Sequence, residues 1–224
     1  MPNFQPAGTW AQQYGAKCLV YGPPGAGKTP IINTAPRPVM IACETGLLSM
    51  KGSTVPCAMA TTPETIADFF QWLLTSHEAK NYDTICLDSG SQMCQILLNR
   101  ELSGKSKSGN KVDGKAAYGA MANKAMEYFN QLYFMAEKHV YIICKCDETE
   151  PVKKPYFPGQ MLNAEVPYLY DEVLYLSLVN IQGVGEVQAM RTKTSYDVLA
   201  RDRSGNLAEF EPPHLTNLFN KILG

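Results

Sequence analysis

The chain has 224 residues, 45% of them hydrophobic and 18% charged, and its 20 basic and 21 acidic residues leave a net charge of −1. This composition supports a sizeable core, excludes wholesale disorder and fits one α/β domain over residues 1–224. No apolar run reaches the ~18–20 residues of a membrane helix, and the start of the chain lacks the basic and apolar regions of a signal peptide.

Five short apolar runs predict buried strands. Their apolarity is continuous rather than alternating, which is typical of parallel strands covered on both faces. The runs span residues 16–21, 38–43, 84–87, 140–144 and 173–179. Four of the seven cysteines lie within these runs, and the cysteine spacings match no zinc site. We therefore expect reduced thiols and a cytoplasmic protein.

Helical patterns separate these runs. Thr62 is expected to cap a helix over residues 63–74, and a longer helix is predicted over residues 116–138. Each carries an apolar stripe on one face, and packing against a sheet is the expected role of both stripes.

The tail differs in pattern from the rest of the chain. Residues 183–191 and 195–201 predict an antiparallel strand pair, and residues 214–223 a short helix. Strands that alternate with helices and end in such an edge indicate an α/β fold with a mostly parallel, twisted sheet flanked by helices. Residues 1–14 form an N-terminal extension in this interpretation.

A phosphate-binding loop follows the first strand. The sequence GPPGAGKT fits G-x-x-x-x-G-K-[ST] at every fixed position. Its glycines let backbone N–H groups face phosphates, Lys28 would reach the β- and γ-phosphates of ATP, and the Thr29 hydroxyl would bind Mg²⁺. The predicted nucleotide contacts are Gly22, Pro23, Pro24, Gly25, Ala26, Gly27, Lys28 and Thr29. Pro36 and Pro38 limit the following helix to about two turns, and a plain Gly/Pro turn is the alternative.

Two carboxylates are expected beside this loop. Asp88 ends the third run, where it would hold Mg²⁺ through water, although a turn cap is the alternative. Ser89 stands where many ATPases place their water-activating glutamate, so hydrolysis needs another base. Glu44 follows the second run, and neighbouring parallel strands bring their carboxyl ends to one place. Glu44 is therefore the predicted base, with a solvated loop glutamate as the alternative.

The order and spacing of these motifs resemble the RecA-like ATPases. The relevant segments are GPPGAGKT, a strand ending in I-x-x-E at residues 41–44, and a strand ending in LDS at residues 87–89. The chain resembles more closely the compact RecA-core proteins of phages, including the single-strand annealing type. This resemblance rests on YGPPGAGKT and on AYG, FPG, YDEV and RDRSG at residues 117–119, 157–159, 170–173 and 201–205.

The resemblance covers about residues 15–222 and implies a fold, ligands and partners. The fold is a RecA-like P-loop core that binds ATP and Mg²⁺. The implied partners are single-stranded DNA, further copies of the chain in a ring or filament, and a single-strand-binding protein as a further candidate. No membrane partner is implied, and a bacterial cytoplasm is the expected location.

The resemblance also implies two DNA-contacting loops, at residues 103–115 and 147–163. Between residues 100 and 124 there are six basic and two acidic residues, a local charge of +4. Lysines neutralise phosphates and aromatic rings stack on bases. The predicted DNA contacts are Lys105, Lys107, Lys111, Lys115, Lys153, Lys154, Tyr156 and Phe157. A solvated surface loop is the alternative for each segment.

Arg201 and Arg203 resemble the paired basic residues that reach a neighbour's γ-phosphate in RecA-fold proteins. Their alternation on a strand places both on one face. A guanidinium suits phosphate because it stays charged and binds in a bidentate fork. The alternative is an ion pair within the chain, with Asp197 or Asp202. Lys145 stands where the family has a polar sensor.

The predicted function is a DNA-dependent ATPase of phage recombination or annealing. One alternative is a P-loop small-molecule kinase, although no arginine-rich lid segment is seen. The other is a nucleotide-gated DNA-binding scaffold with little turnover. ATPase rates with and without single-stranded DNA separate these three functions.

Overall fold

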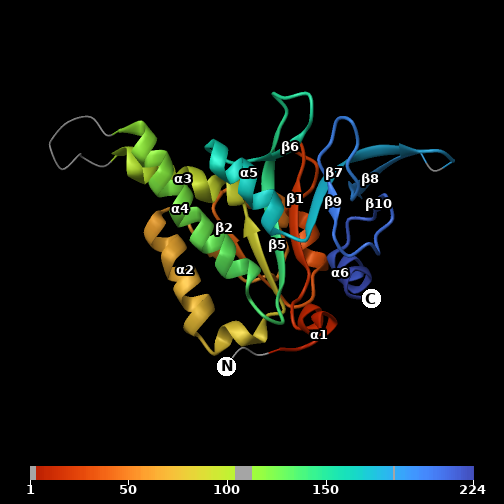
Figure 1. Cartoon of the computed structure of the whole chain (residues 1–224), viewed down its shortest axis with the longest axis horizontal. Coiled ribbons are helices and arrows are strands. Elements are labelled where there is room, and N and C mark those ends of the chain that lie inside the picture. Colours follow the sequence, from red (N-terminus) through yellow and green to blue (C-terminus); the bar gives the residue numbers. More distant parts are fainter. Residues whose placement is uncertain (1–3, 104–112, 184) are drawn as a thin grey trace.

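The computed structural model describes residues 4–103, 113–183 and 185–224 (Figure 1). The strands are β1 (Lys17–Tyr21), β2 (Pro38–Ala42), β3 (Cys57–Met59), β4 (Thr84–Asp88), β5 (His139–Asp147), β6 (Lys154–Tyr156), β7 (Glu172–Ile181), β8 (Gly185–Arg191), β9 (Arg201–Asp202) and β10 (Phe210–Glu211). The α-helices are α1 (Ala7–Gln12), α2 (Pro63–Thr75), α3 (Gly90–Ser103), α4 (Gly114–Tyr133), α5 (Gln160–Leu169) and α6 (Leu215–Leu223). Three 3₁₀ helices are η1 (Pro30–Thr34), η2 (Leu47–Met50) and η3 (Glu78–Asn81).

The described strands form one sheet in the order β10-β8-β7-β1-β5-β4-β2-β3, with β6 paired to β5 and β9 to β7. Pairing is parallel from β7 through β1, β5, β4 and β2 to β3, and antiparallel at β6, β8, β9 and β10. All five predicted runs are strands of the parallel part. The predicted α/β fold, with a mostly parallel sheet flanked by helices and an antiparallel C-terminal edge, is confirmed.

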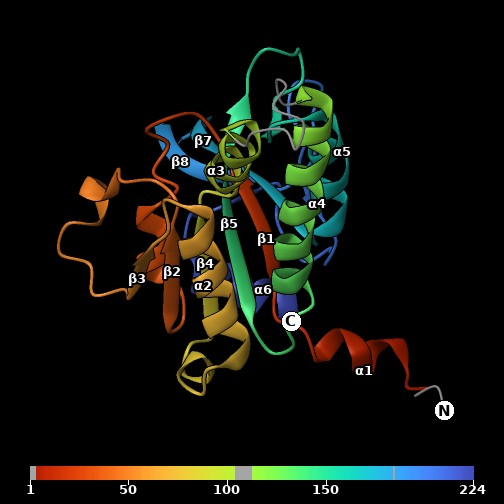
Figure 2. The ribbon, with the colours of Figure 1, turned by 90° about the vertical axis from the view of Figure 1, so that its left-hand side faces the viewer.

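Both faces of the sheet are covered. On β1, Leu19 and Tyr21 belong to the core formed with α2, α3, α4 and α5, whereas Cys18 and Val20 belong to the core formed with η1 and α6. Figure 1 shows α2, α3 and α4 on one side of the sheet and α6 on the other. This two-sided burial explains why successive residues in the middle of the central strands are apolar. Helix α1 extends away from the body (Figure 2).

The antiparallel edge differs from its prediction. Strand β8 pairs with β7, from Ile181 opposite Gly185 to Tyr175 opposite Arg191, and not with residues 195–201. A short connection favours such a hairpin because its two strands are adjacent in sequence. Residues 195–198 instead form a turn in which the Ser195 N–H donates to the Val198 carbonyl. Only Arg201 and Asp202 form a strand, which pairs with the start of β7.

The predicted helices differ in how well their boundaries agree with the structure. Helix α2 begins after a Thr62 cap, as predicted, and its capping box includes Thr65. Helix α4 ends at Tyr133, before the predicted end at residue 138. The segment after the phosphate-binding loop is the 3₁₀ helix η1 and not an α-helix, because Pro30, Pro36 and Pro38 leave little chain for regular helical bonds. Among the described residues, no helix is long and apolar enough to cross a membrane.

Candidate functional site

The loop between β1 and η1 has the backbone that its glycines require. Gly25 and Gly27 have φ angles of +78° and +81°, a region that side chains with a Cβ rarely adopt. The Lys28 ammonium folds back over the loop and donates hydrogen bonds to the carbonyls of Gly22 and Pro23, at 2.7 and 2.8 Å. Burial lowers the pKa of Lys28, and the charge of Asp88 opposes that shift. The loop thus holds a cation against its own backbone.

Two oxygen ligands suited to magnesium meet beside this loop. The Thr29 hydroxyl donates to Oδ2 of Asp88 at 2.7 Å. Asp88 ends β4 and is buried, and burial raises the pKa of its carboxyl while the Thr29 bond opposes the rise. A hydroxyl and a carboxylate are hard oxygen donors of the kind that Mg²⁺ prefers. The residues present therefore fit a magnesium ion.

The predicted base lies at the same place. Glu44 follows β2, is half-buried, and accepts a 2.6 Å hydrogen bond at Oε1 from the Ser89 hydroxyl. Strands β2 and β4 are neighbours, with Ala42 opposite Asp88, so their ends deliver Glu44 and Ser89 to one point. The Ser89 that replaces the usual glutamate is thus the residue that orients the alternative carboxylate.

These groups line one cavity of about 470 Å³ at the carboxyl ends of the parallel strands. Lys28, Thr29, Glu44 and Asp88 line it together with Lys145 from β5. Lys145 is exposed and its Nζ donates to Oε1 of Gln92 at 3.1 Å. With the hydroxyls of Thr29 and Ser89, the cavity combines two cations, two carboxylates and two hydroxyls, which suits a phosphate chain with its metal.

Comparisons with known proteins identify the family. A family model described as an AAA domain matches residues 14–204. The chain belongs to the AAA domain family. It is therefore a nucleotide-binding domain of the ATPase type. None of the curated proteins compared with it matches significantly.

Solved structures also resemble this AAA domain. The flagellar accessory protein FlaH from Methanocaldococcus jannaschii is 11% identical, with 80% of this chain and 78% of that chain covered and a TM-score of 0.41. A KaiC-like protein from the hyperthermophilic archaeon Pyrococcus horikoshii is 10% identical, with the same coverage and a TM-score of 0.43.

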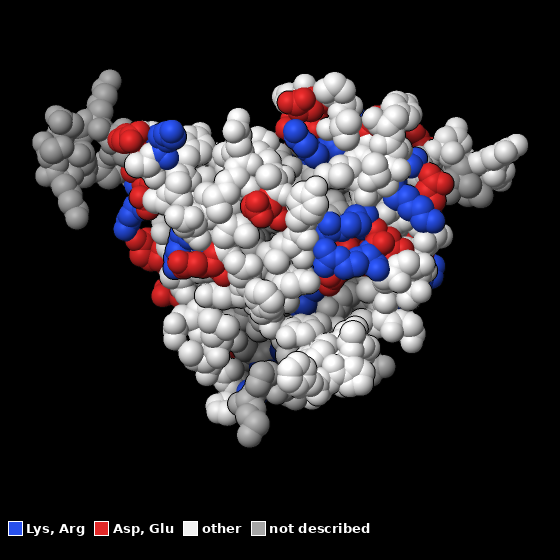
Figure 3. All heavy atoms as spheres, viewed as in Figure 1, with Lys and Arg blue, Asp and Glu red and all other residues white. Residues whose placement is uncertain are grey.

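The predicted DNA contacts of the first loop fall mostly outside the described residues: Lys105, Lys107 and Lys111 lie there. Lys115 is described and is exposed in the first turn of α4, where its backbone N–H donates to Asp113 at 3.0 Å. Figure 3 shows basic and acidic side chains interspersed on the face it presents, so the described residues form no continuous basic surface there.

The second predicted loop gives a mixed result. Lys153 and Lys154 pair with Asp197 and Asp147, at 3.6 and 4.0 Å. Tyr156 is 39% exposed and can offer part of its ring. The prediction for Phe157 is wrong, because its side chain is fully buried and packs edge-on against Phe129, with 5.5 Å between ring centroids. An aromatic residue next to Pro158 and Gly159 has the sequence pattern of an exposed loop residue. In the structure Phe157 instead packs into the core and attaches the loop to it.

A second exposed tyrosine, Tyr196, lies on the neighbouring loop and was not predicted from the sequence. Tyr196 is 93% exposed, in the turn at residues 195–198. Lys153 connects the two loops, because it forms a bridge with Val198 and its N–H donates to the Asp197 carbonyl at 2.8 Å. The two loops lie side by side at the top of Figure 1. This pairing, which the sequence does not reveal, places the turn that carries Tyr196 beside the residues that precede β6.

The two arginines lie at the opposite end of the sheet from the P-loop. Strand β9 pairs with Glu172 and Val173, which lie level with the start of β1. The P-loop follows the other end of β1. Arg201 and Arg203 therefore cannot reach the nucleotide of their own chain, and a role at a γ-phosphate would need a neighbouring chain.

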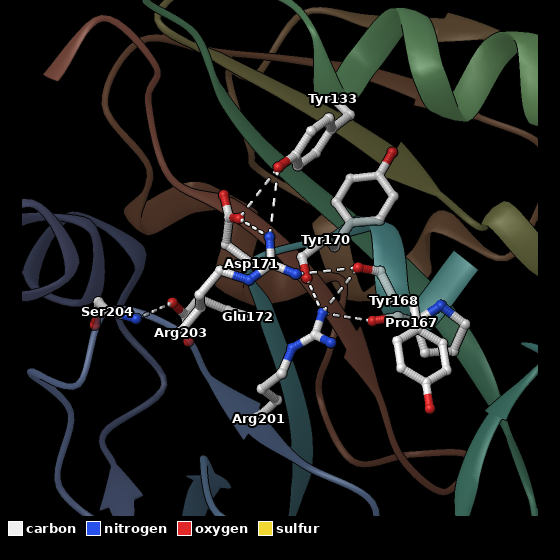
Figure 4. A network of polar contacts seen from close by, with 9 residues as sticks. All are labelled: Tyr133, Pro167, Tyr168, Tyr170, Asp171, Glu172, Arg201, Arg203 and Ser204. Carbon is white, nitrogen blue, oxygen red and sulfur yellow. Dashed lines mark hydrogen bonds and ion pairs between the residues drawn. The ribbon is translucent and has the colours of Figure 1, made fainter. Parts of the chain in front are cut away.

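Arg201 has a structural role within the chain (Figure 4). Its Nη2 donates to the carbonyls of Pro167, Tyr168 and Tyr170, at or just after the end of α5. This supports the in-chain alternative for Arg201, although its partners are not Asp197 or Asp202. Carbonyls at the end of a helix lack partners within the helix and carry partial negative charge, which explains why the Arg201 guanidinium binds them.

Arg203 is half-exposed and pairs with Asp171 at 2.6 Å, and its Nη2 also donates to the Tyr168 carbonyl at 3.1 Å. Its expected role at a neighbour's phosphate stays a prediction.

A buried acid beside this network gives a prediction about stability. Burial, with the charge of Asp202 as the second cause, raises the pKa of Glu172 from 4.5 to about 8. The folded state then keeps a proton that the unfolded state loses, so the free energy of unfolding should fall as pH rises from about 5 to 8. Glu172→Gln should remove this slope and stabilise the protein at pH 8 by about 1 kcal/mol or more.

Urea unfolding at pH 5.5, 7 and 8.5 measures this effect. The exposed Glu186→Gln serves as the control and should keep the wild-type slope. An equal slope in wild type and Glu172→Gln would show that Glu172 is ionised in the folded state.

Proposed function

We propose that the chain hydrolyses MgATP with Glu44 as the base, and that single-stranded DNA stimulates this reaction. One observation carries the proposal: Glu44, from a strand other than those of Lys28 and Asp88, lines the same cavity as both. The alternative role of Glu44, a solvated loop glutamate, does not account for its hydrogen bond from Ser89, the residue after Asp88.

Each residue has a defined part in this proposal. Lys28 leaves the two loop carbonyls and binds the β- and γ-phosphates. Thr29 and Asp88 hold Mg²⁺, which when bound neutralises charge on those phosphates. Ser89 holds Oε1 of Glu44, and Oε2 would accept a proton from the attacking water. Lys145 lines the cavity from β5, and in this proposal its amine would approach the γ-phosphate.

The DNA part of the proposal rests on the two loops. The lysines of residues 103–115 would neutralise phosphates, and Tyr156 and Tyr196 would stack on bases. The resemblance to phage annealing proteins makes strand annealing or recombination the reaction class that we propose. Arg203 would then act on the nucleotide of the neighbouring copy in a ring or filament.

Phosphate release from ATP, measured with and without single-stranded DNA, tests this function. We expect release that needs Mg²⁺ and rises with DNA. A small-molecule kinase would release little phosphate without an acceptor and would ignore DNA. A nucleotide-gated scaffold would bind ATP and leave it intact in both conditions.

Replacing Lys105, Lys107, Lys111 and Lys115 with alanine should weaken DNA binding and flatten its salt dependence. Each lost phosphate contact should reduce the slope of log K against log salt by about 0.7. Fluorescence titration of a labelled oligonucleotide at several salt concentrations measures this slope. The control, Lys80→Ala with Lys221→Ala, removes two exposed lysines from elsewhere on the surface and should keep the slope. A quadruple variant with an unchanged slope would mean that this segment is not a DNA contact.

A further inference from the structure

Two side chains from different strands hold the backbone of the P-loop. Gln188 of β8 donates from Nε2 to the Ala26 carbonyl. Tyr141 of β5 is fully buried, and its hydroxyl donates to the Lys28 carbonyl at 2.9 Å. Neither residue belongs to the P-loop motif, and neither lines the cavity described above. Both therefore act on the loop through its carbonyls.

These bonds fix the direction of two N–H groups. In a trans peptide unit the carbonyl and the following N–H point in opposite directions. A bond from Gln188 to the Ala26 carbonyl therefore turns the Gly27 N–H away from β8, and the bond from Tyr141 turns the Thr29 N–H away from β5. These N–H groups belong to the stretch whose backbone binds phosphate oxygens in a P-loop.

The packing around the loop supports the same arrangement. Gly27 has a φ of +81°, which favours glycine, and a Cβ there would lie 2.5 Å from Nε2 of Gln188 and would displace that amide from the loop. A Cβ on Gly22 would clash with the Leu176 carbonyl of β7. The loop is thus fitted against the β7–β8 hairpin, and Figure 2 shows the segment after β1 beside β8.

We propose that Gln188 and Tyr141 are positioning residues of the nucleotide site, which set the P-loop N–H groups for phosphate before nucleotide binds. Preorganised donors bind an anion more tightly because no loop rearrangement opposes binding. The inference rests on nucleotide binding by the P-loop, but it needs neither hydrolysis by Glu44 nor DNA.

The test measures ATP and ADP affinity by calorimetry in variants that change one hydrogen bond each. Tyr141→Phe removes only the hydroxyl and should weaken both ligands about 3- to 10-fold, the usual worth of one such bond. Tyr170→Phe is its matched control, because the fully buried Tyr170 hydroxyl also donates to a backbone carbonyl, that of Phe129, at 2.9 Å. It should lose similar thermal stability and keep wild-type affinity.

Gln188→Glu keeps the shape of the side chain but cannot donate when ionised. It should weaken ATP about 10-fold or more at pH 8, because the lost bond is joined by repulsion between the carboxylate and the phosphates. At pH 5.5 protonation of the new carboxyl should restore part of the affinity. Gln188→Leu should lose affinity at both pH values alike. Gln182→Glu, an exposed change on the same hairpin, should bind as wild type.

A KM-against-kcat split gives the second readout. In the Gln188 and Tyr141 variants, KM should rise while kcat at saturating ATP stays near wild type, since the base and the metal ligands are untouched. Wild-type affinity in both Gln188→Glu and Tyr141→Phe would overturn the inference. So would an equal loss of affinity in Tyr170→Phe, which would make the effect one of general stability. If wild type itself binds no nucleotide, the proposed function fails instead.

Discussion

Lys28→Ala is expected to abolish productive ATP binding, and with it hydrolysis. Lys28 lines the cavity and its ammonium is held by the carbonyls of Gly22 and Pro23, so a small rotation would carry it to a phosphate. Hydrogen bonds to charged groups contribute about 1.5–3 kcal/mol each, so the loss of one or two corresponds to an affinity at least about 10- to 100-fold weaker. The alanine also leaves two loop carbonyls without their donor.

Calorimetric titration with ATP measures this effect. Lys80→Ala, which removes an exposed lysine remote from the cavity, is the control and should bind as wild type. Unchanged nucleotide affinity in Lys28→Ala would show that the P-loop does not bind the nucleotide.

Glu44→Gln should keep ATP binding and slow hydrolysis by about 10²- to 10⁴-fold, which is the usual contribution of a general base. The glutamine carbonyl can still accept the Ser89 hydrogen bond, so the geometry of the site is preserved while its proton acceptor is lost. Affinity and turnover therefore separate in this variant, unlike in Lys28→Ala.

Steady-state phosphate release at saturating ATP measures the turnover. The control is Glu165→Gln on α5, an exposed glutamate away from the cavity, which should keep wild-type turnover. Turnover at the wild-type rate in Glu44→Gln would place the base elsewhere.

The parts of the site that follow β1, β2 and β4 were predictable from sequence. Each strand is short and mostly apolar, and a glycine or a polar residue stands at its carboxyl end or within two residues of it, so that end can be located to within a residue or two. Because parallel strands present these ends at one edge, Lys28, Glu44 and Asp88 could be expected together before any coordinates. The local sequence pattern of the strands, together with the rule for parallel strands, was sufficient to predict this part of the site.

Contacts between distant segments were not predictable. Tyr141 and Gln188 contact the P-loop because β5 is the neighbour of β1 and β8 lies one strand beyond β7. Nothing in their local sequence marks this contact. The same holds for Tyr196, which the Lys153 bridge brings to β6. Phe157 was wrongly predicted because an aromatic residue next to proline and glycine has the same local signature whether it is buried or exposed.

Helix boundaries failed for a local reason. Three prolines after Thr29 leave the 3₁₀ helix η1 where an α-helix was expected. Helix α5 was not predicted, because Pro167 lies within it and its few buried residues give a weak helical pattern. Arg201 was misjudged because its partners are backbone carbonyls at the end of α5, and the sequence gives no sign of that helix end.

A single-turnover measurement tests the central claim most directly. Protein in excess is loaded with radiolabelled ATP without metal, Mg²⁺ is added in the presence of single-stranded DNA, and bound ATP and ADP are separated over time. Wild type should convert its bound ATP to ADP only after Mg²⁺ is added, while Glu44→Gln should retain intact ATP over the same period. Bound ATP that stays intact in wild type, or equal conversion in wild type and Glu44→Gln, would contradict the account.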